Sequence, residues 1–133
     1  MVDWLRSPGD TRSRVLGAMR ILVGVTFVLS SNAKFLDHAK DVADFRHWGL
    51  TTATSAVVYV IGTVELLAGG VLASGRATRI AAIVLAGDMT GAILTAGLID
   101  GGFHLIVPPL LGGSCLLLAM RGGGARRPWR APD

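Results

Sequence analysis

Residues 55–99 read SAVVYVIGTVELLAGGVLASGRATRIAAIVLAGDMTGAILTAGLI, two long apolar runs separated by a short turn. The runs, 55–73 and 78–99, have the length that an α-helix needs to cross the hydrocarbon core of a membrane. Two further runs of similar length flank them, at 15–36 and 103–120. Isolated strands could not satisfy their backbone hydrogen bonds in lipid. The sequence therefore predicts an all-α integral membrane four-helix bundle.

The composition agrees with a membrane protein. Of the 133 residues, 51% are apolar and only 17% are charged, and the mean hydropathy is +0.55. Glycine is frequent, at 18 residues, and small residues let helices approach closely in lipid. We expect one membrane domain over 1–133, with residues 121–133 as a disordered basic tail. The single cysteine excludes an internal disulfide and a multi-cysteine metal site.

The basic residues predict the orientation in the membrane. Nine Lys and Arg residues lie in the leader, in the second loop and in the tail, whereas the first and third loops carry three. An excess of basic residues marks the cytoplasmic side, so both termini are expected in the cytoplasm. The preference for Arg over Lys suggests a bacterial source and hence the inner membrane. Because these charges flank apolar runs, they indicate lipid headgroups, and we expect no nucleic-acid partner.

The first outward loop, residues 37–54, has a helical pattern of its own. Val42, Phe45 and Trp48 recur at helical spacing among charged side chains. This spacing predicts a short amphipathic helix on the outer surface, with Trp48 at the level of the headgroups. A plain solvated loop is the alternative.

Charged side chains inside a bilayer are costly, so each of them is a candidate for a functional site. The interior of the runs contains three: Arg20, Glu65 and Asp88. At 1.5 Å per residue, Arg20 lies about 9 Å deep and both carboxylates lie about 15 Å deep. Because an arginine side chain can reach inward, we expect the three to form one intramembrane polar cluster. Two interpretations stay open: a structural ion network, or a site for a ligand, a proton or a quinone headgroup.

Small residues accompany these charges. Gly69 shares a helix face with Glu65, and Gly87-x-x-x-Gly91 brackets Asp88. Small residues at this spacing are typical of contacts between membrane helices. We therefore expect the charges to lie at helix contacts.

The fourth run has two features of its own. Pro108 and Pro109 are expected to kink the helix near the outer leaflet, because proline lacks a backbone N–H. Cys115 shares a helix face with His104, and we interpret it as a small packing residue.

A second group of polar residues is expected at the outer ends of the spans. Its members are Asn32, Lys34, Asp100 and His104. His38 and His47 lie in the first outward loop. The spacing of these histidines matches no metal-ligand motif, so we predict no metal site. The chain also lacks a paired-histidine haem site, a dinucleotide-binding fingerprint and a nucleophile elbow, and no catalytic residue is assigned.

Several short motifs, in this order and spacing, resemble the DoxX family. They are RILVG at 20–24, NAKF at 32–35, YVIGTVELLAGG at 59–70, GRATR at 75–79 and DM at 88–89. Asn32 stands where many members have glycine. The resemblance covers about residues 15 to 100 and implies a four-helix membrane fold. It also places the family's recurring Arg, Glu and Asp on Arg20, Glu65 and Asp88.

The family takes its name from small membrane subunits linked to quinone-reducing thiosulfate oxidation. The resemblance therefore implies an integral membrane subunit or scaffold of a redox complex, without catalysis of its own. Its partners would be the bilayer and either another protein of the complex or a second copy. The chain is expected to hold no intrinsic cofactor, and quinone is the cofactor class to consider. The alternatives are a quinone- or proton-handling component of a membrane oxidoreductase, and a small-solute transporter, which the lack of an internal repeat disfavours.

Overall fold

The computed structural model describes residues 14–122, and four long helical segments dominate it. The elements are α2 (Arg14–Leu36), α3 (His38–His47), α4 (Thr54–Ser74), α5 (Thr78–Ala92), the π-helix η1 (Ile93–Gly97), α6 (Leu98–Asp100), the 3₁₀-helix η2 (Gly102–Leu105) and α7 (Val107–Arg121).

Four helical segments are long and apolar enough to span a membrane. They are Arg14–Leu36, Thr54–Ser74, Thr78–Asp100 and Gly102–Arg121. Each end lies within one residue of the expected bound, and the predicted four-helix membrane fold is confirmed. Of the expected tail, Arg121 ends α7, and residues 123–133 lie outside the described part of the chain.

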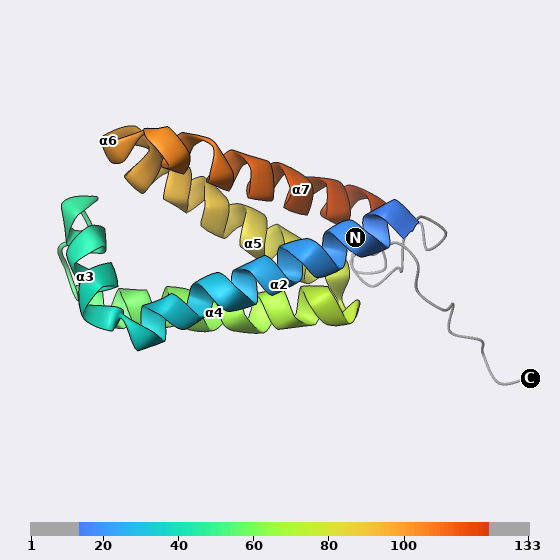
Figure 1. Cartoon of the computed structure of the whole chain (residues 1–133), viewed down its shortest axis with the longest axis horizontal. Helices are drawn as coiled ribbons and strands as arrows, with labels where there is room; N and C mark the ends of the chain where they lie inside the picture. Colours follow the sequence, from blue (N-terminus) through green and yellow to red (C-terminus); the bar gives the residue numbers. More distant parts are fainter. Residues whose placement is uncertain (1–13, 123–133) are drawn as a thin grey trace, which may run out of the picture.

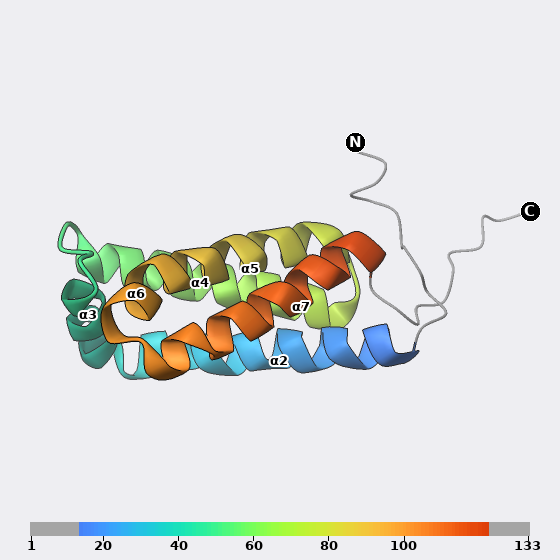
Figure 2. The ribbon, with the colours of Figure 1, turned by 90° about the horizontal axis from the view of Figure 1, so that it is seen from above.

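The four spans pack as two antiparallel pairs. α2 packs on α4, and α5 packs on α7 (Figure 1). The pairs meet where α4 contacts α5 and α2 contacts α7, which closes the bundle (Figure 2). α3 stands across one end of the bundle, here called the α3 end, and the turn at Gly75 lies at the opposite end, the Gly75 end.

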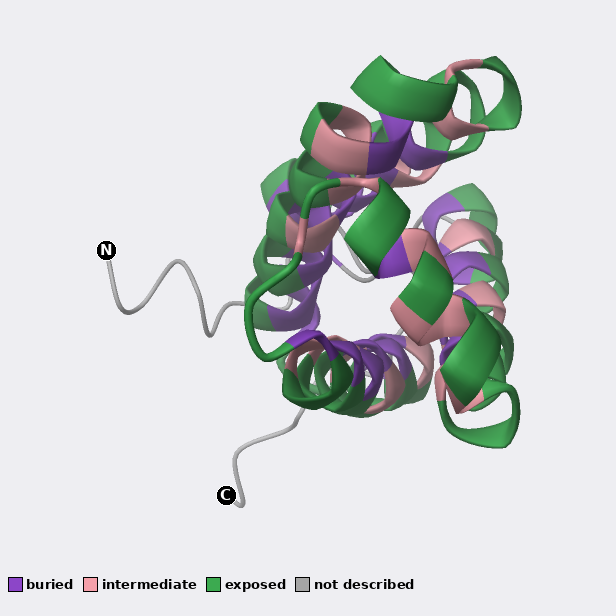
Figure 3. Ribbon diagram, turned by 90° about the vertical axis from the view of Figure 1, so that its left-hand side faces the viewer, coloured by how far each residue is buried: buried purple, intermediate pink, exposed green. Residues whose placement is uncertain are grey.

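The surface of the bundle is apolar, as contact with lipid requires. Leu22, Leu67, Leu94 and Leu110, one on each span, are each at least 61% exposed. The buried residues form narrow stripes that face the bundle axis (Figure 3). Apolar side chains on the outside of four spanning helices place this protein in contact with a lipid bilayer.

Two glycines bring α2 and α4 into backbone contact. A Cβ atom at Gly24 would lie 2.7 Å from the backbone oxygen of Gly69, and one at Gly69 would lie 2.9 Å from the backbone oxygen of Gly24. Any larger residue at these positions would push the helices apart. This contact fixes the register of the pair.

The small residues of α5 lie elsewhere than expected. A Cβ atom at Gly87 or Gly91 would meet nothing within 4 Å. The prediction that Gly87-x-x-x-Gly91 lies at a helix contact is therefore wrong for the described chain. The physical reason is its position on the helix, because both glycines lie on the exposed side of α5.

The third and fourth spans have irregular backbone at the α3 end. The amide of Leu98 donates to the carbonyl of Ile93, the i to i+5 bond of a π-helix. Pro108 and Pro109, where a kink is expected, lie in the first turn of α7, directly after the 3₁₀-helix η2 and Ile106. Proline is tolerated there, since the first amides of a helix have no intrahelical partner.

The short helix predicted within residues 37–54 is confirmed as α3. Phe45 is its buried residue, 8% exposed, and contacts Trp48 with ring centroids 5.5 Å apart. The charged residues of α3 lie on the other side of the helix or at its margin, and Lys40 pairs with Asp44 at 2.9 Å. The helix is thus amphipathic and covers the α3 end with its apolar side.

Candidate intramembrane polar site

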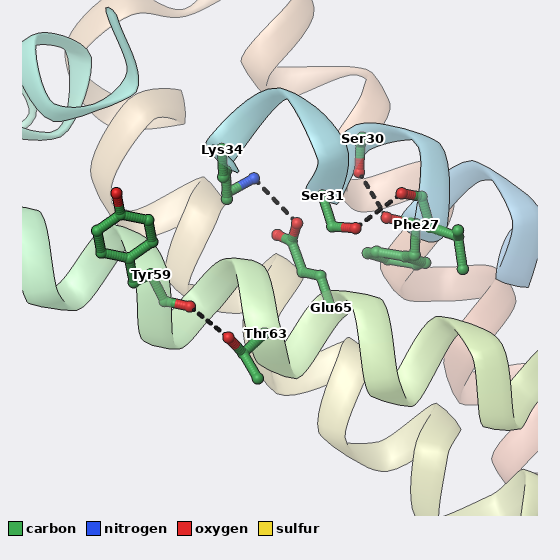
Figure 4. A network of polar contacts seen from close by, with 8 residues as sticks. Phe27, Ser30, Ser31, Lys34, Tyr59, Thr63 and Glu65 are labelled. Carbon is green, nitrogen blue, oxygen red and sulfur yellow. Dashed lines mark hydrogen bonds and ion pairs between the residues drawn. The ribbon is translucent and has the colours of Figure 1, made fainter. Parts of the chain in front are cut away.

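A buried ion pair joins the first two spans. The Nζ atom of Lys34 lies 2.9 Å from Oε2 of Glu65, and the two side chains are 14% and 5% exposed (Figure 4). Lys34 comes from the end of α2, and Glu65 comes from the middle of α4. The lysine therefore extends from the end of its helix toward the centre of the bundle.

The α2–α4 contact positions the pair. A Cβ atom at Gly62 would lie 3.1 Å from Cβ of Lys34, so the two helices approach closely just above the ion pair. One turn earlier on α2, Ser31 is completely buried and donates to the carbonyl of Val28. Apolar packing on both sides excludes water, which strengthens the attraction between the two charges.

Asp88 of α5 completes the group. Its carboxyl group is in electrostatic contact with both Glu65 and Lys34. One of its oxygens, Oδ2, is buried and has no hydrogen-bond partner. Cys115 of α7, which is completely buried, lies within electrostatic range of Asp88. We name Lys34, Glu65 and Asp88 the polar cluster; it joins side chains from three of the four spans.

Arg20 does not belong to this cluster, and the expected trio is corrected here. Its guanidinium donates to the backbone carbonyls of Leu72 and Ala73, at 3.0 and 2.5 Å. Those carbonyls close α4 at the Gly75 end, about seven residues or roughly 10 Å along the helix from Glu65. The antiparallel register therefore places Arg20 beyond reach of the carboxylates and Lys34 beside them.

Arg20 has a capping role at that end. The last carbonyls of a helix have no intrahelical partner, and a cation stabilises this end of the helix dipole. Gly75 follows with φ +78°, and a Cβ atom there would lie 2.8 Å from an Arg20 nitrogen. Glycine is therefore favoured at position 75 for two reasons. It adopts the left-handed backbone without strain, and its lack of a side chain leaves room for the guanidinium.

The polar cluster holds two carboxyl groups and one ammonium group. Lys34 neutralises one carboxylate, and a second unpaired charge would be costly in this setting. A carboxyl group in such a position is stable when it carries a proton. The arrangement can therefore hold a proton near the middle of the membrane and exchange it with a neighbouring group.

Of the four outer-side candidates, Lys34 belongs to the polar cluster, whereas Asp100 and His104 lie in a second group at the α3 end. Asp100 accepts hydrogen bonds from Nε2 of His47 at 2.7 Å and from the indole nitrogen of Trp48 at 2.5 Å. His104 packs edge-on against Trp48, with ring centroids 5.3 Å apart. Asn32 is exposed on α2. Sequence reasoning selected Asp100 and His104 but missed His47 and Trp48 as their partners.

His38 links α3 to the first two spans. Its Nδ1 atom lies 3.1 Å from the carbonyl of Lys34, and its Nε2 atom lies 2.7 Å from Oγ of Ser55. The ring stacks on Tyr59 with centroids 3.8 Å apart. Because a carbonyl only accepts, Nδ1 carries a proton and Nε2 accepts from Ser55 in the neutral ring.

Two charged side chains of α3, Lys40 and Asp41, have shifted pKa values. The hydrogen bond to Asp44 raises the pKa of Lys40. Partial burial raises the pKa of Asp41, and the charge of Lys34 opposes this change. Lys34 therefore lies between an acid at the surface and two acids in the interior.

Residues 14–122 contain no cluster of three or more metal-ligating side chains. A groove of about 410 Å³ runs along the outer side of the bundle between α5 and α7. It is lined by apolar residues with Thr90 among them, and Gly87 and Gly113 give it depth. An apolar chain or a ring could lie in this groove from the lipid side.

Comparison with known proteins agrees with the fold and with these motifs. The chain is 32% identical over 80 residues to a protein of Bacillus subtilis (strain 168) named "Putative oxidoreductase CatD", and the match covers 60% of this chain and 58% of that protein. The chain thus spans less than two thirds of this relative. No solved structure matches significantly. The DoxX family profile matches residues 15–98, which include α2, α4, α5 and the whole polar cluster. The chain belongs to the DoxX family.

Proposed function

We propose that this protein is an integral membrane component of a redox complex, without catalysis of its own, whose polar cluster holds and exchanges a proton. One observation carries the proposal. Asp88 is a second carboxyl group beside an ion pair that is already neutral, and its Oδ2 atom is buried without a hydrogen-bond partner. An ion pair that only joined helices would need one acid.

The redox assignment is supported by similarity and by chemistry. The relative described above is named an oxidoreductase. Reduction of a quinone consumes protons inside the membrane, where water is scarce, and a carboxyl group within hydrogen-bond reach can supply them. We propose quinone as the redox partner. The groove between α5 and α7 would hold its apolar tail, since Gly87 and Met89 line that groove on either side of Asp88.

The proposal includes a location and a partner. The distribution of Lys and Arg favours the bacterial inner membrane, with both termini in the cytoplasm. We propose that another protein of the complex carries the electrons. A second copy of this chain is the alternative partner.

The proton-holding role is tested by infrared spectroscopy on the full-length protein in lipid nanodiscs. We expect a band of a protonated carboxylic acid at neutral pH, and its loss in Asp88→Asn. Asp44→Asn is the matched control, because Asp44 is an exposed acid paired with Lys40, and it should leave the band unchanged. A spectrum without the band would leave the cluster as a structural ion network.

The redox association needs a separate test. The protein is purified in mild detergent, co-purifying proteins are identified by mass spectrometry, and quinone is extracted and quantified. We expect a redox protein and quinone above the level found with an unrelated membrane protein of the same size. In membranes, Asp88→Asn should reduce quinone-linked activity while the thermal stability stays unchanged. Equal loss of stability and activity would support the structural interpretation.

A further inference from the structure

We propose that α3 is a movable strap that closes the α3 end of the bundle above the polar cluster. Hydrogen bonds to Asp100 hold the strap in its closed position. This inference goes beyond the proposed function, because the strap controls access to the cluster whatever reaction the cluster serves. It rests on the contacts at the two ends of α3 and on the weak packing between them.

The first end of the strap is held on α2 and α4. α3 begins two residues after α2 ends. His38, its first residue, is fixed by the carbonyl of Lys34, by the hydroxyl of Ser55 and by the stack on Tyr59. Three contacts on two helices make this end a fixed anchor that lies directly above Lys34.

The second end is held across the bundle. Asp100 lies at the end of the third span, and it accepts hydrogen bonds from both His47 and Trp48. Trp48 also packs against His104 at the start of the fourth span. These contacts join α3 to the α5–α7 pair, so α3 bridges the two helix pairs of the bundle (Figure 1). All of them converge on Trp48 or Asp100.

Between its ends α3 has little to hold it. Phe45 is its one buried residue among His38–His47. A helix of 10 residues is marginal on its own in water. Gly49, at φ +94°, follows the helix and lies in open space. The position of α3 therefore depends on the packing of Phe45 and on its polar contacts, and the second end depends on one carboxylate that is partly open to solvent.

The first experiment measures release of the strap. Amide hydrogen exchange is followed in the full-length protein in nanodiscs, for wild type, Asp100→Asn and Asp44→Asn. Loss of the charged acceptor should speed exchange over residues 42–50 by about tenfold or more. Asp44→Asn breaks the Lys40 pair within α3 and leaves the contacts of Asp100 in place, so it should leave that exchange rate unchanged.

The second experiment measures access to the cluster. In a Cys115→Ala background, Ser31→Cys places the chain's one thiol at a completely buried position one turn below Lys34. A charged, water-soluble thiol reagent should modify it slowly, and Asp100→Asn should raise this rate by about tenfold, in line with the loss of charge-assisted hydrogen bonds. Asp44→Asn should not.

Two results would overturn the proposal. Unchanged exchange in Asp100→Asn would show that α3 is held by other contacts. Faster exchange without faster modification of the Ser31→Cys thiol would show that α3 moves but closes nothing. Hydrogen exchange within α4 and α5 reports general unfolding. His47→Ala removes one of the two hydrogen bonds to Asp100, so it should raise the exchange rate over residues 42–50 by less than Asp100→Asn does. Neither readout depends on a proton at Asp88.

Discussion

Lys34 and Glu65 form a buried ion pair between α2 and α4, with Nζ of the lysine 2.9 Å from Oε2 of the glutamate. Arg20, which lies deeper in the same span by sequence, serves the end of α4 instead. The position of a charge along an apolar run therefore does not tell which partner it meets. The facing helix decides that.

The ion pair should give a large coupling energy in a double-mutant cycle. Lys34→Met and Glu65→Gln should each lower the free energy of unfolding by about 3–5 kcal/mol, because each leaves a buried polar partner unpaired. The double variant should lose much less than the sum, since it leaves no unpaired charge. Unfolding in detergent, followed by circular dichroism, measures these values.

The matched control uses Arg20 in place of Lys34. The losses of unfolding free energy in Arg20→Met and Glu65→Gln should be additive, because the two side chains contact different parts of α4. A strong coupling between Arg20 and Glu65, or additivity between Lys34 and Glu65, would contradict the assignment of the pair.

Alanine substitutions should distinguish the glycines at a close helix contact from the glycines in open positions. Gly24→Ala and Gly69→Ala should each destabilise the bundle by about 1–3 kcal/mol, because the new methyl group meets backbone atoms of the facing helix. Gly87→Ala and Gly91→Ala enter open space, and they should be neutral or gain up to about 1 kcal/mol from helix propensity. Thermal unfolding of the four variants ranks them. Equal losses in both pairs would reject the backbone contact.

Arg20 should act through the end of α4. Arg20→Met removes charged donors from two carbonyls and should cost roughly 1.5–3 kcal/mol. Hydrogen exchange should rise at Leu72 to Gly75 before it rises near Glu65. Arg76→Gln, at the exposed neighbouring position, is the control. The capping role is wrong if exchange at the two places rises together.

The orientation rests on the basic residues. A reporter fused after Asp133 should be active in the cytoplasm only, and a cysteine at Thr52, which is exposed between α3 and α4, should be labelled from outside the cell by an impermeant reagent. The opposite labelling would reverse the map and would place α3 on the cytoplasmic side.

The spans and the buried acids could be predicted from the sequence, because each depends on local information. The length of an apolar run fixes a span, and depth along it singles out Glu65 and Asp88. Lys34, the third member of the polar cluster, could not be predicted in this way. Arg20 and Lys34 lie on nearly the same face of α2, about four turns apart. Which of the two meets Glu65 depends on the register of α2 against α4.

A signal for that register is present in the sequence. If Gly24 and Gly69 are placed opposite each other, an antiparallel pair brings Glu65 level with Val28, which is nearer to Lys34 than to Arg20, and brings Arg20 level with Ala73. Hydropathy carries no such information, because it describes each run by itself and not how two helices are placed against each other. The contacts of Asp100 with His47 and Trp48 lack even this signal, since they join a short helix to a span that is distant along the chain.

The π-helix Ile93–Gly97 determines the direction in which the later side chains of the third span point. Each residue of an α-helix turns the chain by about 100°, so a wide turn that takes in one extra residue rotates the later side chains by about that angle. Asp88 and Asp100 can therefore face different partners on one span. Deletion of Leu94 would remove the extra residue and its wide turn together, so the segment would become a regular α-helix with Asp88 in place and Asp100 still facing His47. In a family tree, a one-residue gap here would mark members that lack the π-helix and still hold the first loop in the same way.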